Sequence, residues 1–301
     1  MPADSNILLS IVVPTYNRAH MLPDTIKSVL NQTYPNFELI IVDDGSTDHT
    51  EDIVKEFLSD RVSYYRRDNA ERSAARNFGT SVAKGDYLNW FDSDDTMFPN
   101  HIEEAMKMIT KNARPEFFAL GFQYEDVSGN VVHRSNFSAD INHDFHKNNQ
   151  LTVDAVFVRR DIALSNLFNE DRGLSGSEDY ELWIRLCAKY HLYTSPAITS
   201  RYIHHSERST ILMSDPDRLI GRYTKFIYYT TSNPEVVALL GKQKGHFVMK
   251  NYLLLAVDLA INNHRRLGLK YLQKAFSNSP MVVFEKGFYA FIKHFLRHSL
   301  S

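Results

Sequence analysis

Apolar and polar residues alternate in blocks along the first 110 residues of this 301-residue chain. Short β-branched runs at 7–14 (ILLSIVVP) and 37–43 (FELIIVD) are typical of strands buried on both faces. Between them, residues 21–32 carry apolar side chains at helical spacing. The same alternation predicts further strands and helices at 62–66, 73–83, 85–92 and 100–109.

Strand–helix alternation with short connections predicts an α/β fold, with a mixed, mostly parallel, Rossmann-like sheet flanked by helices. Three later segments are expected to extend this sheet in an antiparallel or mixed way: 117–126, 130–134 and 152–160. From Asp215 the pattern is helical. We therefore expect a main domain over residues 1–214 and a helical C-terminal extension over 215–301.

Polar clusters follow three of the expected strands, namely PTYNR at 14–18, DDGS at 43–46 and DSDD at 92–95. In open α/β sheets, ligands bind at the carboxyl ends of the strands, where these clusters fall. Helix caps would explain each cluster singly but explain their number less well. A ligand site at this edge of the sheet is therefore expected.

The third cluster places Asp92, Asp94 and Asp95 at the end of an aromatic strand that contains Trp90 and Phe91. One aspartate is enough to cap the helix that follows. A hard divalent ion usually takes one or two carboxylates together with phosphate oxygens. The residue pattern alone leaves metal binding and capping equally open, and it favours Asp94 as the metal ligand.

Other candidate residues also have two interpretations. Asp44 could cap the next helix or accept hydrogen bonds from a ribose hydroxyl or a base N–H. Arg72 and Arg76 share a helical face, which is either a solvated basic face or a pair of donors near a diphosphate or nucleobase. Glu178 and Asp179 begin a helix, where the helix dipole favours acids, but a carboxylate there could also serve as a general base.

Two further segments carry candidate ligand contacts. Tyr16, just beyond the first strand, could stack on a base or pack against the protein. The stretch SRYIHHSERST at 200–210 contains His204, His205 and Arg208. A loop of this composition could hold phosphates.

Charge and composition narrow the classes of partner. The formal net charge of −2 gives no support for nucleic-acid binding, which favours a strongly basic domain. The one cysteine, Cys187, permits no intrachain disulfide and fits a reducing compartment. The first ten residues lack a signal-peptide pattern, and the longest apolar run, 252–261, is far shorter than a membrane span of ~20 residues. We expect a cytoplasmic protein, with peripheral attachment at the inner face of the cell membrane as an open alternative.

Taken together, the motifs resemble the family 2 inverting glycosyltransferases of GT-A fold. The resemblance covers about the first two-thirds of the chain and is specific as an ordered combination, although each motif alone is weak. It is carried by SIVVPTYNR (10–18), SVLNQTYPNFELIIVDDGSTD (28–48), ARNFGTSVAKGDYLNWFDSDD (75–95) and SEDYELWIRL (177–186).

The resemblance implies a role for each matching residue. Donor contacts fall on Pro14, Thr15 and Tyr16 at the nucleobase, Asp44 at the uracil or ribose, Arg72 and Arg76 at the nucleotide, and Asp92 near the ribose, with Ser93 inside the Asp-x-Asp motif. The metal ion, Mn²⁺ or Mg²⁺, would be bound by Asp94 together with Asp92. Asp179 would act as the general base, with Glu178 supporting it or touching the acceptor. His204 or His205, with Arg208, falls in a loop that closes on the diphosphate.

The implied activity is transfer of a sugar from a nucleotide-sugar, with a UDP-sugar expected, to a glycan or lipid-linked glycan. A nucleotidyltransferase is an alternative, but PTYNRAHML lacks the Gly-rich loop with a lysine that it needs. A dinucleotide dehydrogenase would carry a G-x-G-x-x-G motif after its first strand, and this chain has none there. A non-catalytic module that binds sugar nucleotides also stays open, although it would not need Asp179 together with the metal acids.

The C-terminal stretch 282–300 (VVFEKGFYAFIKHFLRHSL) gathers phenylalanines near one helical face, with Lys286, Lys293 and Arg297 among them. Packing on its own domain or on a second copy of the chain, which would form a homo-oligomer, is the favoured interpretation. A helix lying on a membrane surface is the alternative, because basic and aromatic residues suit that position.

Overall fold

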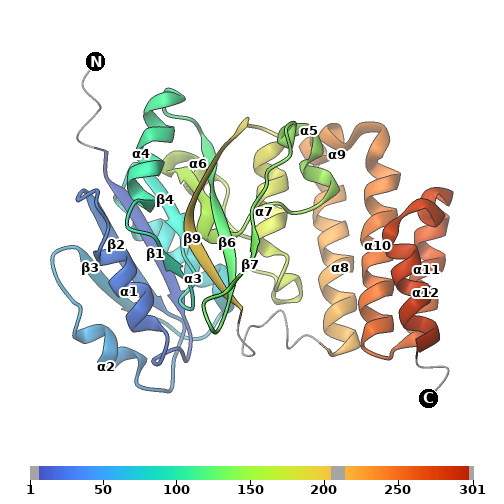
Figure 1. Ribbon diagram of the computed structural model, residues 1–301, viewed down its shortest axis with the longest axis horizontal. Helices are drawn as coiled ribbons and strands as arrows, with labels where there is room; N and C mark the ends of the chain where they lie inside the picture. Colours follow the sequence, from blue (N-terminus) through green and yellow to red (C-terminus); the bar gives the residue numbers. More distant parts are fainter. Residues whose placement is uncertain (1–6, 205–213, 298–301) are drawn as a thin grey trace. The chain divides into compact units, whose positions relative to one another are not determined.

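The computed structural model describes residues 7–204 and 214–297 (Figure 1). Contacts between Cα atoms group the chain into two compact units. The first unit comprises residues 1–170 and 190–205, and the second comprises residues 171–189 and 206–301. The second unit thus takes in a short segment, 171–189, besides the C-terminal stretch. The division into domains at residue 214 stays a prediction.

The first unit is built on one mixed sheet with the strand order β3-β2-β1-β4-β8-β6-β9-β5, in which β7 also pairs with β6. Strands β1 to β4 are parallel, β8 is antiparallel to β4 and β6, and β9 is parallel to β6. The strands are β1 (Leu9–Thr15), β2 (Phe37–Asp43), β3 (Val62–Arg66), β4 (Tyr87–Trp90), β5 (Thr96–Met97), β6 (Phe117–Asp126), β7 (Val131–Arg134), β8 (Val156–Arg159) and β9 (Leu192–His204). The predicted fold class is confirmed.

Helices flank this sheet (Figure 1). They are α1 (Leu22–Leu30), α2 (Thr50–Lys55), α3 (Glu71–Val82), α4 (His101–Lys111), α5 (Ile141–Asp144) and α6 (Arg160–Ser165). All seven residues of β1 are buried, as the continuous apolar run predicts. Helix α3 approaches β1 closely at Gly79, where a Cβ atom would come within 2.3 Å of Val12 Cγ1.

One predicted strand is shorter than expected for a physical reason. Residues 152–160 form a strand only over Val156–Arg159, and a 3₁₀ turn at Val153–Ala155 precedes it. The side chain of Asp154 in that turn accepts a hydrogen bond of 2.7 Å from the backbone N–H of Asp92. This contact holds the turn against the end of β4, out of the strand ladder.

The described part of the second unit is helical. Its α-helices are α7 (Glu178–Cys187), α8 (Pro216–Ser232), α9 (Pro234–Leu240), α10 (Lys244–Ile261), α11 (Arg265–Asn278) and α12 (Lys286–Arg297). Helix α10 contacts α8, α11 and α12, and its buried Leu253 and Leu255 lie in one apolar cluster with Phe291 of α12. None of the helices in residues 7–204 and 214–297 combines the length and apolar character that crossing a bilayer requires.

His101, the first residue of α4, is fully buried in the core of the first unit. Its ring packs against Phe91 and Phe157. Its Nδ1 atom lies 2.8 Å from the hydroxyl of Thr199, and Nε2 lies 3.4 Å from Asn89 Oδ1. Burial lowers the pKa of His101 from 6.5 to about 3, so the ring is neutral in the folded protein.

The free energy of unfolding should therefore fall with pH below neutrality. The unfolded chain takes up a proton on His101 near pH 6.5 and the folded chain does not, so stability present above pH 6.5 is lost as the pH falls toward 3. We expect this residue to account for about 2 kcal/mol of lost stability between pH 7 and 5. Urea unfolding of His101→Gln should show that part of the pH dependence removed.

The matched control is His49→Gln, because the side chain of His49 is 90% exposed. This variant should keep the pH dependence of the unmodified protein. An unchanged slope in His101→Gln would contradict the assignment of a buried neutral ring.

Candidate active site

The sheet topology brings the polar clusters of the sequence to one edge. Strands β2 and β4 both pair with β1 in parallel, so their carboxyl ends lie beside the end of β1. Thr15 pairs with Asp43 at this edge, and Val12 pairs with Trp90 two residues before Asp92. The expected clustering of strand-end residues is thus present in the first unit.

The acidic cluster is compact. Asp92, Asp94 and Asp95 each offer a carboxylate oxygen, and these three oxygens all lie within 4.8 Å of one another. Helix α1 holds the turn that carries them, because the hydroxyl of Thr25 lies 3.0 Å from the carbonyl oxygen of Ser93 and 2.8 Å from that of Asp95. The turn is therefore fixed by tertiary contacts as well as by its own sequence.

Each carboxylate of the cluster has a different neighbour. Arg76 Nη2 donates a hydrogen bond of 2.7 Å to Asp92, and Arg18 Nε lies 4.0 Å from Asp94. Asp95 is fully buried and accepts a hydrogen bond of 2.8 Å from the backbone N–H of Ile203. Three carboxylates face two guanidinium groups here, and an all-oxygen ligand set of this kind fits a hard divalent cation. The cluster could therefore bind a metal ion.

Arg76 is held in place by α3 and by residues that follow α6. Its side chain is 2% exposed, and its guanidinium carbon lies 5.2 Å from the centre of the Phe168 ring. Phe168 in turn meets Trp90 edge to face at 4.9 Å. Asn77 fixes the backbone of Phe168 from both sides, donating to its carbonyl and accepting from its N–H at 2.9 Å each. Arg76 thus reaches the acidic cluster as part of a rigid, aromatic support.

The end of β1 contributes the predicted donor-binding residues. Pro14 and Thr15 are buried, whereas Tyr16 is 47% exposed. Thr15 Oγ1 is buried and has no hydrogen-bond partner among residues 7–204 and 214–297. Asn17 follows with a positive φ of 51°, and its side chain accepts a hydrogen bond of 2.8 Å from the N–H of Thr47. The turn after β1 is therefore tied to the loop after β2.

Asp44 lies inside the protein rather than on its surface. It is 3% exposed, and its carboxylate accepts a hydrogen bond of 3.0 Å from the backbone N–H of Ala70. Burial raises the pKa of Asp44, and the backbone hydrogen bonds at Ala70 and Glu71 act in the opposite direction. Asp44 therefore anchors the connection into α3, where Glu71 has a positive φ of 75° and Arg72 is half-buried.

The two acids predicted to supply the general base lie in the second unit, at the start of α7. Glu178 is 4% exposed and accepts a hydrogen bond of 2.6 Å from the N–H of Gly176, which has a positive φ of 88°. Asp179 is half-buried. The carboxylate of Glu178 thus stabilises the loop ahead of the helix.

The last predicted segment is described only in part. His204 ends β9 and is exposed. His205 and Arg208 lie outside the described residues.

Sequence reasoning missed three members of the site. Arg18 belongs to the PTYNR motif, and the signal that could identify it is its position four residues beyond Pro14, at the strand end. Asp95 belongs to the acidic run, but the sequence gives no reason to assign it to the metal. Asp154 gave no sequence signal, because its role depends on a contact with residue 92, which is 62 positions away.

Residues 10–163, just over half of the chain, match the family model described as "Glycosyl transferase family 2". The chain belongs to this family. The resemblance to family 2 that was inferred from the sequence motifs is thereby confirmed at the level of the family.

Curated relatives agree with this family. A protein of Rickettsia bellii described as an uncharacterized glycosyltransferase is 31% identical over 67% of this chain and 31% of its own length. The chain spans about a third of the length of the first Rickettsia relatives it matches. The Escherichia coli protein "UDP-Glc:alpha-D-GlcNAc-diphosphoundecaprenol beta-1,3-glucosyltransferase WfgD" is 29% identical over 81% of this chain and 97% of its own length.

Solved structures show the same fold at low sequence identity. S. aureus TarS 1-349 in complex with UDP-GlcNAc is 14% identical with a TM-score of 0.64, and the match covers 98% of this chain and 92% of that one. The mannosyltransferase PcManGT from Pyrobaculum calidifontis, in complex with GDP-Man and Mn²⁺, has 14% identity and a TM-score of 0.56, covering 97% and 87%. The expected GT-A fold is confirmed.

Proposed function

We propose that this protein is a metal-dependent inverting glycosyltransferase that moves a sugar from a UDP-sugar to a glycan or lipid-linked glycan. The observation that carries the proposal is the compact cluster of Asp92, Asp94 and Asp95 at the carboxyl end of β4. The printed names of similar proteins support the classes of ligand, since they include UDP-GlcNAc, UDP-Glc with a diphosphoundecaprenol acceptor, and Mn²⁺.

Asp94, together with Asp92, would hold the divalent cation, Mn²⁺ or Mg²⁺. When bound, such an ion supplies Lewis-acid stabilisation of the charge that develops on a departing diphosphate. Arg76 fixes the orientation of the Asp92 carboxylate through the 2.7 Å contact. Arg18 stands beside Asp94, where its guanidinium is also suited to a phosphate oxygen.

The nucleoside part of the donor would lie at the ends of β1 and β2. The exposed ring of Tyr16 offers a stacking surface for the base, and Pro14, which is buried in β1, would line the nucleobase pocket as the family resemblance implies. The buried hydroxyl of Thr15 offers a hydrogen bond that no described residue takes. Asp44 would act at the uracil or ribose.

The remaining donor contacts rest on the family resemblance. Ser93 lies inside the acidic motif, and Arg72 lies two residues after Ala70, whose N–H bonds to Asp44. His204 ends β9, and Arg208 lies outside the described residues.

In the proposed reaction, Asp179 removes the proton of an acceptor hydroxyl. The oxygen then attacks the anomeric carbon on the side opposite the leaving nucleoside diphosphate, so the configuration inverts. Glu178 holds the loop ahead of Asp179 through its hydrogen bond to the Gly176 N–H. A non-catalytic sugar-nucleotide module would bind donor by the same strand ends but would show no turnover.

Calorimetric titration tests the donor class and the metal site together. UDP should bind in the presence of Mn²⁺, and binding should weaken strongly in EDTA. Asp94→Asn should lose the metal-dependent part of the affinity because it removes a charged ligand. GDP and CDP are titrated separately, and their affinities are compared with that of UDP.

The control variant is Asp52→Asn, since that carboxylate is exposed and belongs to α2. It should titrate like the unmodified protein. Metal-dependent affinity that survives in Asp94→Asn would refute the metal assignment, and equal affinity for GDP would refute the choice of uridine.

Turnover tests the base. With a hydrolysis or transfer assay on a UDP-sugar panel, Asp179→Asn should lower kcat by about 10²–10⁴ while donor affinity stays within a few-fold, because a general base acts in the transition state. Asp217→Asn, which alters an exposed acid in the first turn of α8, is the matched control. A fall in donor affinity as large as the fall in rate would argue against this role.

We further propose that α12 and the turn before it form a contact surface for a membrane. Phe284, Tyr289 and Leu296 are largely exposed, and Lys286 and Lys293 are exposed on the same segment. An amphipathic segment with aromatic and basic residues suits the bilayer interface. A homo-oligomer through these helices is the other outcome that the surface would permit.

Vesicle co-sedimentation tests the membrane contact. Removing the whole segment would expose the apolar cluster, because Val282 and Phe291 are buried in it. We therefore expect the double variant Phe284→Ser/Leu296→Ser to bind vesicles containing anionic lipid less than the unmodified protein, while Leu58→Ser, which alters an exposed residue of the first unit, does not. Equal binding by all three proteins would remove the membrane proposal, and a change in sedimentation without lipid would point to an oligomer.

A further inference from the structure

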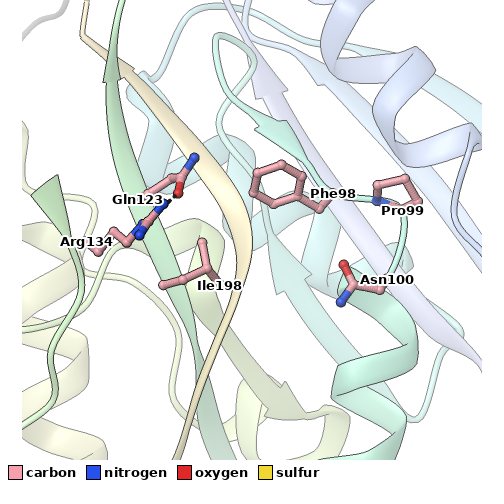
Figure 2. Close-up of a pocket in the computed structure, with 6 residues that line it drawn as sticks. All are labelled: Phe98, Pro99, Asn100, Gln123, Arg134 and Ile198. Carbon is pink, nitrogen blue, oxygen red and sulfur yellow. Dashed lines mark hydrogen bonds between the residues drawn. The ribbon is translucent and has the colours of Figure 1, made fainter. Parts of the chain in front are cut away.

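A second pocket opens on the sheet of the first unit, apart from the acidic residues. Its volume is about 400 Å³, and it is lined by Phe98, Pro99, Asn100, Gln123, Arg134 and Ile198. Figure 2 shows Gln123, Arg134 and Ile198 on one side of the pocket and Phe98, Pro99 and Asn100 on the other. None of these residues belongs to the proposed donor or metal site.

A row of side chains crosses three strands beside the pocket, and two members of the row, Gln123 and Arg134, line it. Gln123 of β6 pairs with Arg134 of β7 on one side and with Arg201 of β9 on the other. Residues that pair directly in a sheet present their side chains on the same face. Two arginines therefore flank one glutamine, and the Arg201 guanidinium carbon lies 4.7 Å from the centre of the Phe98 ring.

The positive charge of this row is only partly compensated. Within the described residues, neither Arg134 nor Arg201 makes an ion pair with a carboxylate, and Nε of Arg201 is buried without a hydrogen-bond partner. Arg134 Nε donates to Gln123 Oε1 at 3.3 Å, and Gln123 Nε2 donates to Glu125 at 2.6 Å. Among residues 7–204 and 214–297, Glu125 is thus the one carboxylate tied to the row, against two guanidinium groups.

The uncharged polar side chains of the pocket, Asn100 and Gln123, are of a type that binds sugar hydroxyls. The amide of Asn100 does not cap α4, and each amide carries both donors and acceptors. Pro99 and Ile198 supply apolar surface against which the C–H face of a sugar ring can pack. The volume lies within the ~300–1,000 Å³ range typical of small-molecule sites.

We propose that this pocket binds a small anionic carbohydrate, a sugar that carries a phosphate or a carboxylate. Arg134, which lines the pocket, would bind the anionic group, because a guanidinium presents paired N–H donors that match carboxylate and phosphate oxygens. Arg201 adds positive charge beside it. Asn100 and Gln123 would bind the hydroxyls. A free sugar phosphate and a sugar acid share this chemistry, and the experiment below separates them.

The test is titration by calorimetry of glucose 1-phosphate, glucuronate, glucose and inorganic phosphate into the full-length protein, with EDTA present. We expect one or both sugar anions to bind at least about tenfold more tightly than glucose and than inorganic phosphate, a difference of about 1.4 kcal/mol. Tighter binding of glucose 1-phosphate identifies the phosphate source, and tighter binding of glucuronate identifies the carboxylate. Equal binding of glucose, or of inorganic phosphate, would overturn the proposal.

Variants locate the site. Arg134→Gln should weaken binding of the sugar anion about tenfold, and it should fold normally because β7 is exposed along its length. Lys111→Gln makes the same change of charge at the far end of α4 and should bind like the unmodified protein. Equal weakening by both variants would show that binding follows net charge, which would overturn the site.

A third variant separates this pocket from the acidic cluster. Asp94→Asn should leave binding of the sugar anion in EDTA unchanged. Loss of binding in Asp94→Asn with retention in Arg134→Gln would place the anion at the proposed donor site and overturn the proposal. This outcome does not bear on whether UDP binds with Mn²⁺, so the two proposals fail independently.

Discussion

Repulsion among three carboxylates is the constraint on which the rest of the first unit depends. Their oxygens lie within 4.8 Å of one another at the end of a buried strand. One such pair of like charges costs about 4 kcal/mol at the dielectric typical of sites near a protein surface. Arg76 comes from α3, Arg18 from the turn after β1 and the Ile203 N–H from β9. The cluster can persist only where all three elements have already assembled around it.

The contact between Arg76 and Asp92 fixes the positions of these two side chains more than it contributes to the stability of the fold. Desolvation of a buried ion pair offsets most of its attraction, so the pair adds little to the free energy of unfolding. Losing one partner, however, leaves an uncompensated buried charge. The supports around Arg76 fit this interpretation, because Phe168, Trp90 and Asn77 restrict its guanidinium to one place. A preorganised charge of this kind has no reorganisation cost when a ligand binds.

How well the sequence predicts each element depends on whether the deciding contacts are local. The strand at 37–43 is confirmed to the residue, because a continuous apolar run buried on both faces leaves little choice. The strand at 62–66 is also confirmed, although it is an edge strand with only its first residue buried. The strand expected at 152–160 is too long, since Asp154 bonds to a backbone group 62 residues away. The sequence places Arg18 at the end of a strand, but its contact with Asp94 and the pairing of Gln123 with Arg201 could not be predicted, because they join segments far apart in the chain.

The same distant pairing links the acidic cluster to the second pocket. Strand β9 places Arg201 opposite Thr96, the residue directly after Asp95, and it places the Ile203 N–H on the Asp95 carboxylate. A slip of β9 by one residue would turn Arg201 to the opposite face of the sheet. It would also replace the donor that satisfies Asp95. The need to satisfy a buried carboxylate thus fixes the register of β9, and that register in turn determines that two arginines share one face with Gln123.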